Sequence, residues 1–251
     1  MLNIVVPMAG RGSRFADAGY TDPKPLIKVH GKRMIEVVIN NLTPSCEHRF
    51  IFVCQEDHVK AYNLDAIFSN NCKNYEIVTI NAITEGAAIT VLKARAFFDN
   101  DEPLMIANSD QWVDVDINDY LQDMEQRNLS GSMLTMQADD PKWSYAKVDS
   151  KGSVSEVVEK VVISDEATVG IYNFAKGSDF CHFADFMVEQ DIRSNGEFYV
   201  APVYSFMADK GQNIGVYNIG EEANGMYGLG IPADLNLFLS LAISKKAIAF
   251  K

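Results

Sequence analysis

The strongest structural signal in this chain lies at residues 2–27, which read LNIVVPMAGRGSRFADAGYTDPKPLI. An apolar run over residues 2–8 leads into small and basic residues, and Lys24-Pro25-Leu26 follows shortly after. A buried strand that opens into a glycine-rich loop lets backbone N–H groups come close to a phosphate. Because Arg14 and Lys24 add positive charge at the same place, the segment predicts a site for a phosphorylated ligand.

The distribution of charge supports this prediction. Residues 1–33 carry a net charge of +4, whereas the whole chain carries −12, so the remainder carries −16. A basic segment in an acidic protein favours a small anionic ligand. The acidic remainder would repel a nucleic-acid backbone or an anionic lipid surface, so we expect neither nucleic acid nor membrane as a partner.

Composition places the chain among ordinary globular proteins. It has 251 residues, of which 47% are hydrophobic and 22% charged, enough to build a full core. No apolar segment is long enough to span a membrane, and the N-terminal apolar run lacks the basic start of a signal peptide. The four cysteines show no CxxC pairing. These features predict a cytoplasmic protein with reduced cysteines.

The pattern of apolar runs predicts an α/β fold with a mainly parallel sheet. In the first half, strands are expected at residues 2–8, 49–54, 76–80 and 103–107, and helices at 34–42, 57–68 and 86–98. In the second half, strands are expected at residues 130–136, 145–149, 154–158, 168–174 and 213–218, and helices at 178–189, 197–209 and 233–246. We expect one domain over residues 1–251, with a more antiparallel second half from residue 130.

Two common phosphate-binding motifs do not match. The dinucleotide fingerprint needs a third glycine where this chain has Phe15, and it needs a helix where we expect a loop that runs on to Lys24. This disfavours a nicotinamide oxidoreductase. The Walker motif is excluded because no Gly-Lys-Ser/Thr is present.

The combination Gly-x-Gly-x-Arg followed by Lys-Pro-Leu resembles the sugar-phosphate nucleotidyltransferase family, also called nucleoside-diphosphate-sugar pyrophosphorylases. The resemblance implies a Rossmann-like, GT-A-like fold with helices on both faces of the sheet. It implies that residues 1–129 bind a nucleoside triphosphate and that residues 130–251 bind a phosphorylated small acceptor. It also implies Mg²⁺ as cofactor and allows a homodimer.

A second matching segment is Met105-Ile106-Ala107-Asn108-Ser109-Asp110. An Asp at the carboxyl end of a parallel strand points into the ligand crevice, and Mg²⁺ prefers carboxylate and phosphate oxygens. The family has its metal-binding Asp here, so Asp110 is the expected metal ligand. Asp114 and Asp116 lie nearby and imitate the Asp-x-Asp of glycosyltransferases, but we expect Asp116 to cap the next helix.

Other segments match more weakly, and the resemblance assigns each a role. Thr84-Glu85-Gly86 is expected to contact the base, although Thr84 is also a good helix cap. The Glu159-Lys160 pair, Gly170 and Glu197 match acceptor-binding positions. The full set of expected nucleotide contacts is Met8, Ala9, Gly10, Arg11, Gly12, Ser13, Asn81, Glu85, Gly86 and Ser109. The expected acceptor contacts are Gly170 and Glu197, and the expected catalytic residues are Arg14, Lys24 and Lys160.

One departure from the family concerns the metal. Relatives that bind sugar phosphates carry Trp-x-Asp-x-Gly-Thr-Pro, whose Asp is a second metal ligand, but this chain has Gly228 at that position, within residues 226–232. Either Asp110, phosphates and water hold Mg²⁺, or another acid assists.

The resemblance predicts attack by an acceptor phosphate on the α-phosphorus of a nucleoside triphosphate, with release of pyrophosphate. The altered segment at Gly228 and the compact chain favour CTP over UTP or dTTP, and the family suggests a role in capsule or surface-polysaccharide synthesis. Two alternatives stay open: a GT-A glycosyltransferase that uses a nucleotide-sugar, and an inactive regulator that only binds nucleotide.

Overall fold

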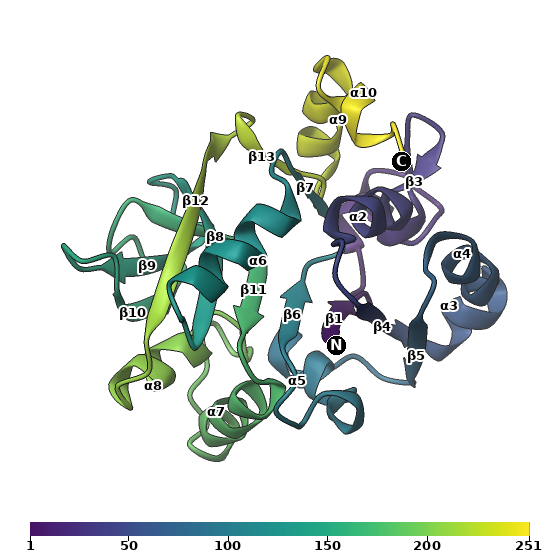
Figure 1. The fold of residues 1–251 in the computed structure, drawn as a ribbon. Coiled ribbons are helices and arrows are strands. Elements are labelled where there is room, and N and C mark those ends of the chain that lie inside the picture. Colours follow the sequence, from purple (N-terminus) through teal and green to yellow (C-terminus); the bar gives the residue numbers. More distant parts are fainter. Residues whose placement is uncertain (251) are drawn as a thin grey trace.

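The computed structural model describes residues 1–250. Within them, one sheet of eleven strands crosses the molecule in the order β5-β4-β1-β6-β11-β8-β12-β13-β7, and β9 and β10 attach beside β11 (Figure 1). The predicted α/β fold, with a mixed and largely parallel sheet, is confirmed.

The first half of the chain builds one side of this sheet and also supplies the strand at its opposite end, β7. Its strands are β1 (Leu2–Pro7), β4 (His48–Gln55), β5 (Tyr75–Ile80), β6 (Leu104–Ala107) and β7 (Gln111–Val113), and β2 (Lys28–Val29) forms a separate hairpin with β3 (Lys32–Arg33). Its helices are α1 (Ser13–Asp17), η1 (Lys24–Leu26), α2 (Met34–Leu42), α3 (Glu56–Ala61), α4 (Leu64–Asn71), α5 (Ala87–Leu92), η2 (Arg95–Phe97) and α6 (Ile117–Gln126). Strand β1 lies between β4 and β6 and is parallel to both, and β4 is parallel to β5.

The second half is more antiparallel, as predicted. Its strands are β8 (Gly131–Gln137), β9 (Ser144–Val148), β10 (Val154–Glu159), β11 (Glu166–Phe174), β12 (Ile214–Glu222) and β13 (Gly225–Gly228). Its helices are α7 (Gly177–Glu189), α8 (Val203–Asp209), α9 (Pro232–Ser240) and α10 (Ser244–Ala247). Strand β11 runs antiparallel to β6 and β8, whereas β12 is parallel to β8.

Helices cover both faces of the sheet because side chains alternate along the buried strands. In β1, Ile4 and Val6 join the apolar cluster that contains residues of α2, α4 and α6, whereas Val5 joins the cluster that contains residues of α5, α7 and α8. A third cluster packs α9 and the chain end against α2, with Trp112 and Leu229 in it.

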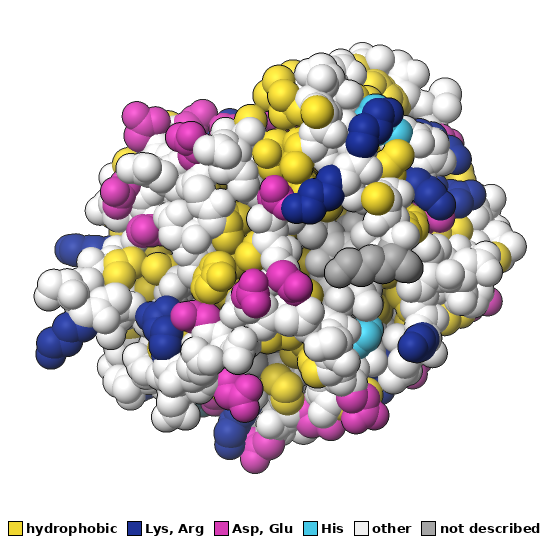
Figure 2. Space-filling view, turned by 45° about the horizontal axis from the view of Figure 1, so that its top comes forward, with side chains coloured by type: hydrophobic (Ala, Val, Ile, Leu, Met, Phe, Trp, Pro, Cys, Tyr) yellow, Lys and Arg dark blue, Asp and Glu magenta, His cyan; other side chains and the backbone are white. Residues whose placement is uncertain are grey.

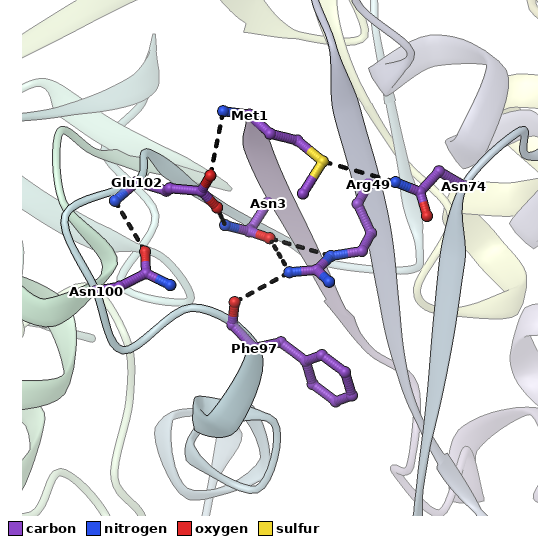
Figure 3. A network of polar contacts seen from close by, with 7 residues as sticks. All are labelled: Met1, Asn3, Arg49, Asn74, Phe97, Asn100 and Glu102. Atoms are coloured by element: carbon purple, nitrogen blue, oxygen red, sulfur yellow. Dashed lines mark hydrogen bonds and ion pairs between the residues drawn. The ribbon is translucent and has the colours of Figure 1, made fainter.

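A polar network ties the amino ends of three neighbouring strands together (Figure 3). Asn3 is fully buried in β1. Its amide oxygen accepts a hydrogen bond of 2.7 Å from Arg49 of β4, and its amide nitrogen donates to Glu102 at 3.3 Å. Arg49 also donates to the carbonyl of Phe97 at 3.0 Å. Buried polar groups are therefore paired at this end of the sheet, which leaves the carboxyl ends of the strands for the site.

Several predicted helices are wrong in their extent. The helix expected at residues 57–68 is broken into α3 and α4 by Asn63, whose φ is 49°. The helix expected at 197–209 begins only at Val203, and the one expected at 233–246 ends at Ser240 and resumes as α10. The helix expected at 86–98 ends at Leu92, and the short helix α1 replaces part of the loop expected after Phe15.

Among residues 1–250, we find no helix of sufficient length and apolarity to cross a lipid bilayer.

Candidate functional site

The glycine-rich loop follows β1 directly, and hydrogen bonds with β4 hold its first residues in place. Met8 and Ala9 are buried; the Met8 amide donates to the Val53 carbonyl at 2.9 Å, and the Ala9 carbonyl accepts a hydrogen bond of 2.8 Å from Gln55. Gly12 has a left-handed φ of 61°, which glycine adopts without strain. The segment from Gly10 to Arg14, apart from the half-buried Gly12, stays exposed at the carboxyl end of β1.

Lys24 lies against this loop and pairs with the aspartate predicted as metal ligand. A Cβ built on Gly12 would come within 3.3 Å of the Lys24 Cβ. The Lys24 Nζ lies 2.6 Å from the Asp110 Oδ2, and both side chains are about a quarter exposed, at 24% and 22%. Asp110 stands between β6 and β7, where the end of a parallel strand presents it to the crevice. The structure thus brings Asp110 to the loop and to Lys24, from which it is separated by 86 residues in the sequence.

Asp234 joins this group, and it was not among the predicted site residues. It lies in the first turn of α9, and a Cβ built on Gly228 would come within 3.2 Å of its Oδ2. Burial raises the pKa of Asp234, and the carboxylates of Glu222 and Asp110 raise it further, whereas Lys142 and Arg14 lower it. One feature of the sequence points to Asp234: it is the first acidic residue after Gly228, the position at which this chain departs from the family pattern.

A second group of predicted residues gathers around Lys160. This residue follows β10 with a left-handed φ of 58°, and its Nζ donates a hydrogen bond of 2.7 Å to the Tyr199 hydroxyl and lies 4.8 Å from the centre of that ring. The hydrogen bond with Tyr199 raises the pKa of Lys160, and the nearby charges of Glu159 and Glu197 raise it as well. Tyr199 is therefore a direct partner of the predicted residue Lys160, and it was not among the residues predicted from the sequence.

The segment expected to contact the base is packed against the loop that contains Arg193 and Phe198. A Cβ on Gly86 would lie 2.4 Å from the Phe198 carbonyl oxygen, the Phe198 amide donates to the Glu85 carbonyl at 2.8 Å, and the Glu85 carboxylate pairs with Arg193 at 2.6 Å. Gly86 is thus required by the neighbouring backbone, and Thr84 is not the helix cap, because Gly86 occupies that position. Asn81 is exposed just after β5.

The remaining predicted residues lie between these groups. Gly170, with a φ of 78°, leaves room for Asn108 and Gln111, since a Cβ there would come within 2.1 Å of the Asn108 amide nitrogen. Ser109 is buried beside Asp110. Glu197 is bridged to Ser194 in a loop and does not open a helix. Among residues 1–250, no hydrogen bond or ion pair joins the Lys24–Asp110 group to the Lys160–Tyr199 group.

The two acids that imitate an Asp-x-Asp motif are engaged elsewhere. Asp116 caps α6, as predicted, and its Oδ1 accepts a hydrogen bond of 2.9 Å from the Asn118 amide. Asp114 forms an ion pair with Lys246 near the C-terminus. Both have structural partners, which speaks against the glycosyltransferase alternative.

One face of the molecular surface carries charges of both signs (Figure 2). Several Lys and Arg side chains lie at its upper right, and others lie along the left and lower margins, where Asp and Glu also occur.

Comparisons with known proteins agree with this architecture. The chain is 28% identical to the nucleoside-diphosphate-sugar pyrophosphorylase from Vibrio cholerae RC9, with a TM-score of 0.79 over 95% of this chain and 100% of that one. It shares the fold of the inositol-1-phosphate CTP transferase from T. maritima, with a TM-score of 0.75 at 13% identity over 98% of this chain and 96% of that one.

A curated relative and a family model identify the class of enzyme. Over 178 residues, 69% of this chain, it is 24% identical to the bifunctional protein GlmU of Methanococcus aeolicus, and it spans 40% of the length of that relative. Residues 4–205 match the family model described as nucleotidyl transferase. The match covers most of the chain and includes the loop, Lys24, Asp110, Lys160 and Tyr199, and the chain therefore belongs to the nucleotidyl transferase family of enzymes.

Proposed function

We propose that this enzyme transfers a nucleoside monophosphate from a nucleoside triphosphate to a phosphorylated small acceptor and releases pyrophosphate. An oxygen of the acceptor phosphate forms a bond to the α-phosphorus, and the bond from the α-phosphorus to the oxygen that bridges to the β-phosphorus breaks. The acceptor phosphate has a second pKa near 6 and is largely ionised at neutral pH, so no general base is needed. Residues 1–129 serve the nucleotide and residues 130–251 the acceptor, within one domain.

The observation that carries this proposal is the contact of 2.6 Å between Lys24 and Asp110 beside the glycine-rich loop. A lysine and an aspartate that meet beside an exposed glycine-rich loop provide one group for phosphate oxygens and one for a cation. Phosphoryl and nucleotidyl transfer depend on positioning and on charge neutralisation, which these groups supply.

The residues present fit Mg²⁺. The Asp110 Oδ2 already has a cationic partner in the Lys24 ammonium, and it lies over Gly230, where a Cβ would stand 2.7 Å away. Among residues 1–250, no group of three or more His, Cys, Asp or Glu side chains is placed to hold a metal. Mg²⁺ is commonly bound by one or two carboxylates, with phosphates and water completing its ligands. When bound, it neutralises charge on the phosphate oxygens.

The chain's own residues then have the following roles. Backbone amides of the loop from Met8 to Ser13, with Arg14, bind the triphosphate. Lys24 lies next to the α-phosphate and stabilises the charge of the transition state. Lys160, held by Tyr199, orients the acceptor phosphate, and Glu197 and Gly170 lie on the acceptor side. Asn81, Glu85, Gly86 and Ser109 complete the nucleotide site.

Among nucleotides we favour CTP over UTP or dTTP, because the segment around Gly228 departs from that of the sugar-phosphate enzymes. We propose a sugar phosphate or another small phosphate as acceptor, a cytoplasmic enzyme, and a role in capsule or surface-polysaccharide precursors. Neither a nucleic acid nor a membrane is a proposed partner.

The test is pyrophosphate release from the four ribonucleoside triphosphates and dTTP, each with a panel of phosphorylated sugars and polyols in the presence of Mg²⁺. We expect CTP to give the highest kcat/KM. Lys24→Ala is expected to lower kcat by about a hundredfold, the usual effect of losing one preorganised charge. Lys28→Ala, an exposed lysine of β2, is the control and should retain full activity. Near-normal turnover of Lys24→Ala would contradict the proposal.

A further inference from the structure

Two glycines form a bare strip beside the proposed cation site. Gly228 ends β13, and Leu229 and Gly230 continue the chain next to Asp110, whose carbonyl accepts a hydrogen bond of 2.8 Å from the Leu229 amide. Leu229 is fully buried in the third apolar cluster. Because side chains alternate in an extended chain, Gly228 and Gly230 face the opposite side, toward the site. We call residues 228–230 the glycine strip.

Each glycine of the strip lies close to one carboxylate. A Cβ on Gly230 would stand 2.7 Å from the Asp110 Oδ2, and a Cβ on Gly228 would stand 3.2 Å from the Asp234 Oδ2 and 3.7 Å from the Asp234 Cβ. Two positions that are two residues apart on an extended chain are roughly 7 Å apart. The strip therefore places two carboxylates, one just before β7 and one in α9, on the same side of the chain, where the charge of Asp110 acts on Asp234.

The charges of Lys142 and Arg14 act on the Asp234 carboxylate, but neither side chain touches it. Within the part of the chain that the structure describes, it makes no ion pair with Lys or Arg and accepts no hydrogen bond, although it is partly buried. A half-buried carboxylate without a partner is costly. It stands in the volume that a side chain at position 228 would fill, and position 228 is where sugar-phosphate relatives have their second acid.

We propose that Asp234 supplies the second carboxylate of the divalent-cation site, in place of an acid at position 228. That this cation serves nucleotidyl transfer rests on the proposed function, whereas its binding to the protein does not. Asp110 and Asp234 bind the cation from either end of the glycine strip, and phosphate and water provide the other ligands. A Cβ at position 230 would collide with the Asp110 carboxylate, and a Cβ at position 228 would be in tight contact with Asp234, so the two glycines leave both carboxylates room to bind a cation.

The test is a titration of the free protein with Mn²⁺ alone, in which free Mn²⁺ is measured by electron paramagnetic resonance. We expect one site in the unaltered protein that Mg²⁺ displaces, and at least tenfold weaker binding in Asp234→Asn. The matched control is Asp119→Asn. Asp119 is the third residue of α6, as Asp234 is of α9, so it removes a charge from the same position of a helix, and it should leave binding unchanged.

A relocation variant separates ligation from folding. In Gly228→Asp/Asp234→Asn the carboxylate moves to the neighbouring position, and the φ of Gly228 is not in the left-handed region, so a side chain there is not strained. We expect Mn²⁺ affinity to return to within about threefold of the unaltered protein.

Three outcomes would overturn the proposal: unaltered protein that does not bind Mn²⁺, Asp234→Asn that binds as tightly as unaltered protein, or equal weakening in Asp119→Asn. If the Mn²⁺ results hold but no nucleotide gives pyrophosphate, the cation site stands and the proposed reaction is wrong.

Discussion

At the scale of the residue, Tyr199 determines where the Lys160 ammonium lies. The lysine backbone is in the left-handed region, so its long side chain leaves the turn in a direction that the Tyr199 hydroxyl and ring then stabilise. We expect Tyr199→Phe, which keeps the ring and removes the hydrogen bond, to raise the KM for the acceptor about tenfold and to leave the KM for the nucleotide unchanged. Steady-state kinetics with an acceptor from the panel would check this, with Tyr62→Phe as control. Equal increases in both KM values would contradict a role on the acceptor side.

Glu159 makes stability depend on pH. Burial raises its pKa above the ordinary 4.5, although the Ser144 hydroxyl and Lys160 act to lower it. Between 4.5 and the raised value the folded protein holds a proton that the unfolded chain has lost, so the contribution of Glu159 to the free energy of unfolding falls as pH rises through this interval. Above it the penalty stays constant. Urea unfolding at a series of pH values from 4 to 8 should therefore show that the free energy of unfolding of Glu159→Gln, relative to that of the unaltered protein, increases as pH rises. A difference that does not change with pH would contradict the prediction.

The glycine-rich loop and the residues near it could be singled out from the sequence as candidates, but some of the partners that the structure gives them could not. Gly12, Lys24 and Asp110 stand in short local patterns whose chemistry is visible in the sequence. The position of Asp234 depends on the register of β13, and that of Tyr199 depends on the loop that packs on Gly86. Neither position follows from the few residues around it in the sequence. Long-range packing decides such positions.

At the scale of the element, the contact of α5 with the Phe198 loop explains why position 86 is a glycine. Its φ of 127° and the Phe198 backbone at 2.4 Å from a built Cβ both exclude a side chain. Gly19 has a φ of 86° but nothing within 4 Å, so Gly19→Ala should cost only backbone strain, about 1 kcal/mol. In Gly86→Ala the new methyl group also collides with the Phe198 backbone, so this variant should lose at least about 2 kcal/mol more of its free energy of unfolding than Gly19→Ala. Urea unfolding of the two variants measures both, and equal losses would contradict the packing argument.

Helix ends show where local patterns fail. The apolar spacing over residues 57–68 continues through Asn63, yet this residue takes the left-handed conformation that Asn tolerates, and the helix divides there. Strands β7 and β13 are only three and four residues long. They exist because they pair with each other, which no local window reveals.

At the scale of the whole molecule, the parallel half of the sheet was predictable and the complete strand order was not. Strand β11 of the second half lies between β6 and β8, and β7 of the first half pairs only at the far end of the sheet, with β13. The proposed nucleotide and acceptor halves are thus interleaved. We expect fragments 1–129 and 130–251, expressed separately, to lack cooperative unfolding, because each exposes unpaired strand edges. Circular dichroism and size-exclusion chromatography would test this, and co-expression should restore a folded complex. Two independently stable fragments would contradict the single-domain proposal.

The pairing of β7 with β13 also affects the order in which parts of the fold can form during synthesis. Strand β7 ends at Val113 and its partner begins at Gly225, so at 5–20 residues per second the ribosome needs roughly 6–20 s to make the second strand after the first. During that interval Asp110 is already synthesised, but the strand that will lie beside it does not yet exist. A nascent chain can form the apolar layers around β1 before β13 has paired with β7 next to Asp110. The cation site is therefore among the last features to be completed during synthesis, and a chain that stops before Gly225 would carry the loop and Lys24 without it.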